Sequence, residues 1–73
     1  MESCYQIYIV FNNEKESEAI CETIEDAMEI MRKLIGRPNV YSAILGHYSN
    51  EYPTGYNIIC SIRNNSYLRG REM

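Results

Sequence analysis

The chain has 73 residues, 45% of them hydrophobic, and its ten acidic and seven basic residues give a net charge of −3. These values fit one small folded domain and exclude an intrinsically disordered chain. No apolar run approaches the roughly 20 residues that a membrane-spanning helix needs. The N-terminus lacks the basic and apolar parts of a signal peptide, and three cysteines, an odd number, argue against a disulfide framework. We therefore expect a cytoplasmic protein.

The first predicted element is a strand over residues 4–11, in which apolar residues recur at every second position. Residues 12–15 are turn formers. The next segment allows two interpretations, because apolar residues recur at three- and four-residue steps from Ile20 to Ile35. One is a single helix over residues 16–35. The other is a short strand over residues 17–22, followed by a helix that begins at Thr23.

We favour the shorter helix, because Thr23 is a good N-cap and Asp26 follows three residues later, as in a capping box. Gly36 and Pro38 then predict its end near Ile35. Two further strands are expected over residues 39–46 and 56–63, separated by a loop over 47–55 that contains His47. Residues 64–73 lose periodicity, which predicts a folded domain over 1–63 and a flexible tail over 64–73.

These elements predict an α+β fold, with a small antiparallel sheet and one helix on one face. The order is ββαββ, and the runner-up is βαββ. The other face of the sheet must be solvated, or covered by a partner or by a second copy in a homodimer.

No catalytic set is present: His47 is the only histidine, no cysteine is placed beside it by the spacing, and there is no glycine-rich phosphate loop. We expect no enzymatic activity, no cofactor and no metal.

Charge is unevenly distributed, because residues 1–31 carry eight of the ten acidic residues and one base. If the hairpin and the start of the helix are neighbours, these carboxylates form one negative surface. Such a surface could bind a basic groove of another protein, including one that holds nucleic acid. The alternative is an ordinary solvated face. The candidate protein-binding carboxylates are Glu22, Glu25, Asp26 and Glu29.

The chain contains seven tyrosines and no tryptophan. Tyr5 and Tyr56 fall on the apolar faces of their strands and are expected in the core. Tyr48 and Tyr52 lie in the expected loop and are candidate anchors for a protein partner, because exposed tyrosines are enriched at binding hot spots. The alternative is that Tyr52-Pro53 only shapes a turn.

A second candidate surface is basic and lies near the C-terminus. Arginines with an aromatic residue among them can follow a nucleic-acid backbone and stack a base. The net acidic balance weighs against this use. Its residues are Arg63, Tyr67, Arg69 and Arg71.

In small size, acidic balance, a single helix over Thr23–Ile35 and the lack of an active site, the chain resembles the small inhibitor proteins of bacteriophages, including anti-CRISPR proteins. This resemblance implies stoichiometric binding to a host nuclease or polymerase in the host cytoplasm, and it carries over no site residues. The hairpin before the helix also looks loosely like HicB-type antitoxins, although Ser17–Glu22 is short and poor in glycine. We therefore expect a non-enzymatic inhibitor or adaptor; the alternative is a nucleic-acid-binding regulator or antitoxin-like protein.

Overall fold

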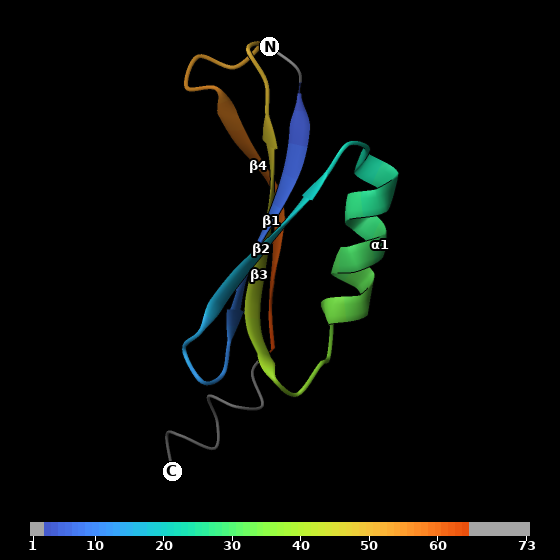
Figure 1. Ribbon diagram of the computed structural model, residues 1–73, viewed down its shortest axis with the longest axis vertical. Helices are drawn as coiled ribbons and strands as arrows, with labels where there is room; N and C mark the ends of the chain where they lie inside the picture. The colour runs from blue at the N-terminus through green and yellow to red at the C-terminus, as the bar shows by residue number, and fades with distance from the viewer. Residues whose placement is uncertain (1–2, 65–73) are drawn as a thin grey trace.

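The computed structural model describes residues 3–64, and it has four strands and one helix. The elements follow the order β1 (Cys4–Phe11), β2 (Glu16–Cys21), α1 (Ile24–Leu34), β3 (Val40–Tyr48) and β4 (Tyr56–Arg63). The strands form one antiparallel sheet in the spatial order β2-β1-β3-β4. Figure 1 shows α1 lying along one face of this sheet, so the predicted α+β class is confirmed.

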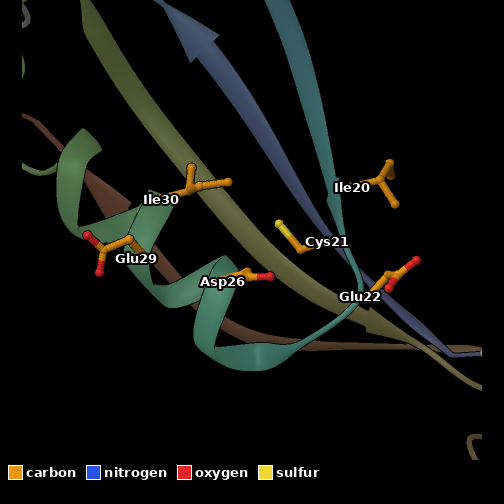
Figure 2. Close-up of a pocket in the computed structure, with 6 residues that line it drawn as sticks. All are labelled: Ile20, Cys21, Glu22, Asp26, Glu29 and Ile30. Atoms are coloured by element: carbon orange, nitrogen blue, oxygen red, sulfur yellow. The ribbon is translucent and has the colours of Figure 1, made fainter.

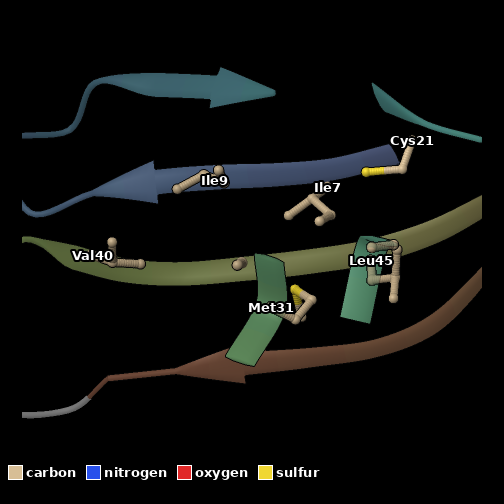
Figure 3. Close-up of a cluster of buried hydrophobic side chains, with 8 residues drawn as sticks. Ile7, Ile9, Cys21, Met31, Val40 and Leu45 are labelled. Atoms are coloured by element: carbon tan, nitrogen blue, oxygen red, sulfur yellow. The ribbon is translucent and has the colours of Figure 1, made fainter. Parts of the chain in front are cut away.

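The core lies between α1 and the facing side of the two central strands. Its buried strand residues are Ile7 and Ile9 from β1, Val40, Ala43 and Leu45 from β3, and Cys21 from β2. Figure 3 shows all of these except Ala43 with labels. Met31 of α1 packs over them and is 2% exposed. Alternation along each strand puts every second side chain on this face, and we call the opposite side of the sheet the open face.

Helix α1 begins and ends where the local sequence requires it. The Thr23 backbone is extended, and its hydroxyl oxygen accepts a hydrogen bond from the Asp26 N–H at 3.1 Å. This bond satisfies one of the free N–H groups of the first turn. At the other end Gly36 has a φ of +78°, which favours glycine. The helix therefore ends at Leu34, and Ile35, expected on its apolar stripe, is exposed.

Within residues 3–64, no helix combines the length and the apolar character needed to cross a membrane.

Strand β3 is longer than expected. It continues through His47 and Tyr48, which the sequence assigns to a loop, because His47 pairs with both Tyr5 and Asn57 across neighbouring strands. Pairing with β1 and β4 thus keeps His47 and Tyr48 in the strand, although the residues after them favour a turn. The loop between β3 and β4 is correspondingly shorter than the predicted one.

Strand β4 contains a bulge that the sequence pattern does not reveal. Leu45 pairs with Cys60 but Gly46 pairs with Ile58, so Ile59 is an extra residue. The bulge moves Tyr56 and Ile58 to the open face, whereas Cys60 and Ile62 pack against the core. The expectation that Tyr56 is a core residue is therefore wrong. Tyr5 packs against the core, as expected.

Asn64, the first residue of the expected tail, belongs to the folded part of the structure. Its side-chain amide donates to the carbonyl oxygens of Leu34 at 3.1 Å and Val40 at 2.9 Å, and its oxygen accepts from the Gly36 N–H at 2.9 Å. The side chain therefore ties the end of β4 to the end of α1 and the start of β3. The remainder of the expected tail, residues 65–73, lies outside the described residues.

Candidate protein-binding site

An open groove separates the end of β2 from the first turns of α1. Three of the four predicted protein-binding carboxylates line it, namely Glu22, Asp26 and Glu29. Ile20, Cys21 and Ile30 complete the lining. Figure 2 shows the Cys21 side chain directed toward the helix, whereas Ile20 points to the other side of the strand. We call this feature the acidic groove; it combines carboxylates with an apolar floor.

The helix start explains why acidic residues are tolerated so close together. Glu25 and Asp26 lie in the first turn of α1, where the partial positive charge of the helix end stabilises anions. Glu25 is exposed but does not line the groove. The same carboxylates therefore serve helix stability and remain accessible to a partner.

Within residues 3–64, Glu29 is the one groove carboxylate that forms an ion pair. Arg32 donates to its Oε1 at 2.8 Å, one turn further along α1. This hydrogen bond, together with the charges of Arg32 and Lys33, lowers the pKa of Glu29 below its usual range. Glu29 therefore stays ionised at neutral pH, and the pair is exposed enough for a partner's cation to compete with Arg32.

Cys21 forms the buried part of the groove floor. Burial, with a smaller contribution from the Asp26 carboxylate, raises the pKa of its thiol. The thiol is therefore protonated at neutral pH and contributes apolar surface to the groove. Because the thiolate is the reactive form of cysteine, a protonated Cys21 is also unreactive.

The remaining acidic residues do not join this groove. Glu16 and Glu18 alternate with Ala19 and Cys21 along β2 and therefore lie on the open face, opposite α1. Glu14 lies in the β1–β2 turn, at the other end of β2 from the start of the helix. The expected single negative surface is thus divided into two, one on each side of the sheet. The period-two pattern of residues 16–21 contained the signal for this division.

The two candidate tyrosine anchors lie on opposite faces of the sheet. Tyr48 is on the open face, where its hydroxyl donates to Gln6 at 3.2 Å and its ring lies 4.6 Å from that of Tyr56. Tyr52 lies in the β3–β4 loop, and its hydroxyl is 2.8 Å from Nδ1 of His47. The structure therefore does not bring the two tyrosines together.

An aromatic cluster that the sequence did not reveal surrounds His47. Tyr5 stacks on the imidazole with ring centroids 4.4 Å apart, and Tyr52 meets it edge-on at 5.5 Å. Tyr5 also pairs with Cys21 of β2, so this cluster occupies the strand positions next to the acidic groove. Figure 1 shows the β3–β4 hairpin extending beyond the start of α1, so the helix does not cover this end of the sheet.

Of the residues proposed for nucleic-acid binding, the structure places only Arg63. It lies at the end of β4 with its guanidinium 5.6 Å from the centre of the Tyr41 ring. Tyr67, Arg69 and Arg71 lie outside the described residues. Between Ser3 and Asn64, no three His, Cys, Asp or Glu side chains are grouped as a metal site requires.

Comparison of the chain with protein-family models, with curated proteins and with solved structures found no match.

Proposed function

We propose that the protein is a small, non-enzymatic inhibitor or adaptor that binds a basic surface of another protein through the acidic groove. The observation that carries the proposal is the combination of Glu22, Asp26 and Glu29 with the apolar side chains of Cys21 and Ile30 in one open groove. Lysine and arginine have an apolar stem and a charged end, so they match both parts of such a lining.

The expected partner is a protein with a basic patch, such as an enzyme that processes nucleic acid. Opposite potentials would steer the two surfaces together and reject partners of like charge. Tyr52 and the neighbouring His47 cluster supply rigid aromatic surface at the same end of the sheet. Inhibition would follow if the partner's basic patch were also its nucleic-acid site. The protein would then act stoichiometrically, in the cytoplasm of the cell in which the partner works.

The proposal is tested by affinity capture with the intact protein and with a Glu22→Lys/Glu29→Lys variant, followed by quantification of each bound protein. We expect the intact protein to capture basic proteins, and these should elute as the salt concentration is raised. The recovered amount of each should be at least about tenfold lower with the variant. A Glu14→Lys/Glu51→Lys variant is the matched control, because it makes the same charge change outside the groove. Equal recovery by the intact protein and the groove variant would contradict the proposal.

A further inference from the structure

The open face of the sheet carries most of the exposed apolar surface on the described strands. Its large side chains include Ile20, which is 61% exposed, and Ile58, which is 57% exposed. Tyr48, on the same face, is 36% exposed. Single exposed apolar residues need no explanation, but a set of them on one sheet face is typical of an interaction surface.

The cross-strand pairs arrange this face in level rows that contain one residue from each strand, in the order β2, β1, β3, β4. The first row is Glu16, Val10, Ser42 and Arg63. The second row is Glu18, Tyr8, Ile44 and Ser61. The third row is Ile20, Gln6, Gly46 and Ile58.

The charges in these rows are separated by edge. Glu16 and Glu18 lie on the β2 edge, and Arg63 lies at the level of Glu16 on the β4 edge. Residues 3–64 contain one ion pair, Glu29–Arg32 on α1, so none of these three groups has an oppositely charged partner within that part of the chain. Glu18 instead accepts a hydrogen bond from the uncharged side-chain amide of Gln6 at 2.8 Å.

We propose that a second copy of this chain covers the open face, related to the first by a two-fold axis that runs parallel to the strands. Such a rotation keeps each row level and places β2 of one copy over β4 of the other. Glu16 then faces Arg63 of the second copy, and by symmetry Arg63 faces its Glu16, so the interface contains two ion pairs. The third row places Ile20 over Ile58, and the second places Tyr8 over Ile44.

The charge pattern selects this arrangement over the other two-fold packing of the same faces. An axis perpendicular to the strands would place β2 over β2. The two β2 edges, each with Glu16 and Glu18, would then lie over one another and gather four carboxylates at one side of the interface. Arg63 would lie over the β4 edge, which has no acidic residue on this face. Like charges across an interface are unfavourable, so the parallel axis is the one that the sequence supports.

The size of the domain gives a second reason for a covered face. A chain of this length buries only about 60% of the surface that its unfolded form exposes, so small domains gain much from association. When two sheets pack face to face, the side chains between them form a core about 10 Å thick, and the strands of the two sheets are nearly aligned. Helix α1 and the groove carboxylates Asp26 and Glu29 lie on the outer side of each sheet, so the dimer would leave them accessible. Ile20, which borders the groove from the open face, is the residue that the two surfaces share.

The test is the oligomeric state of the full chain, measured by sedimentation equilibrium over a range of concentrations. We expect the intact protein to sediment at twice its 8.5 kDa chain mass. Glu16→Arg and Arg63→Glu should each weaken the dimer about tenfold or more, because each substitution turns both symmetric ion pairs into repulsions. The double variant Glu16→Arg/Arg63→Glu should recover an affinity within about threefold of the intact protein, because it restores both pairs in reversed order.

Lys33→Glu is the matched control, since it makes the same charge change as Arg63→Glu but on α1, away from the open face. It should leave the dimer affinity unchanged, and circular dichroism should show that all variants are folded. A monomeric intact protein would overturn the proposal. The proposal would also be overturned if the single variants Glu16→Arg and Arg63→Glu had the dimer affinity of the intact protein, or if the double variant did not recover that affinity, because either result would indicate a different interface.

Discussion

Asn64 connects three segments that are far apart in sequence through one side chain. Its oxygen accepts the N–H of Gly36, and its amide nitrogen lies within 3.3 Å of the carbonyls of Leu34, Arg37 and Val40. Two amide protons serve three carbonyls, so one proton is shared. These groups span the last residue of α1, the turn after it and the first residue of β3, and the carbonyls of Leu34 and Arg37 each also accept a backbone N–H. Asn64 therefore supplies a C-terminal cap from a distant strand.

Asn64→Ala should lower the free energy of unfolding by about 2 kcal/mol, because each lost hydrogen bond is worth about 0.5–1.5 kcal/mol and the partners are only partly solvated. Urea unfolding followed by circular dichroism measures the change. Asn64→Asp is the informative companion, because it keeps an acceptor for Gly36 but places a carboxylate against three carbonyl oxygens. It should destabilise at least as much as alanine. An Asp variant as stable as the intact protein would show that the amide donors contribute little.

At the scale of elements, the boundaries set by local chemistry could be predicted, and those set by distant pairing could not. Thr23 with Asp26 identified the start of α1, and Gly36 identified its end, because caps act through the backbone of neighbouring residues. The continuation of β3 through His47 and the bulge at Ile59 depend on which residue each strand meets in its neighbour. For the same reason, the sequence predicted the carboxylates of the acidic groove but not its apolar side chains. Its helix residues follow from sequence, but its apolar floor requires the packing of β2 against α1.

The N-cap is the interaction on which the start of α1 depends most directly. Thr23→Ala should lower the free energy of unfolding by about 1 kcal/mol, because the Asp26 N–H loses its acceptor. Thr23→Ser keeps the hydroxyl oxygen and should cost only a few tenths of a kcal/mol, so it is the control. Thermal or urea unfolding of the intact protein and of the two Thr23 variants measures these changes in the free energy of unfolding. Equal losses for alanine and serine would assign the effect to the lost methyl group instead of the cap.

At the scale of the whole molecule, the sheet separates two surfaces of different character. One side carries α1, the acidic groove and the cluster around His47. The other carries an apolar face with carboxylates on one edge and Arg63 on the opposite edge. The formal charge of −3 therefore describes neither surface. The proposed dimer would present two acidic grooves on its outer sides, so a partner with two basic patches, or two copies of a partner, would bind with increased avidity.

The proposed dimer also makes stability depend on protein concentration. Association adds only to the folded state, so mass action favours that state as concentration rises. For a native dimer that unfolds to two separate chains, a tenfold increase in concentration should raise the apparent free energy of unfolding by about 1.4 kcal/mol per mole of dimer. Urea unfolding of the intact protein at two concentrations should therefore give a higher midpoint in the more concentrated sample. Glu16→Arg should lower the midpoint at both concentrations while remaining folded, because it weakens the dimer, and Lys33→Glu should give the midpoints of the intact protein. A midpoint that is the same at both concentrations in the intact protein would show that the open face contributes nothing to stability through association.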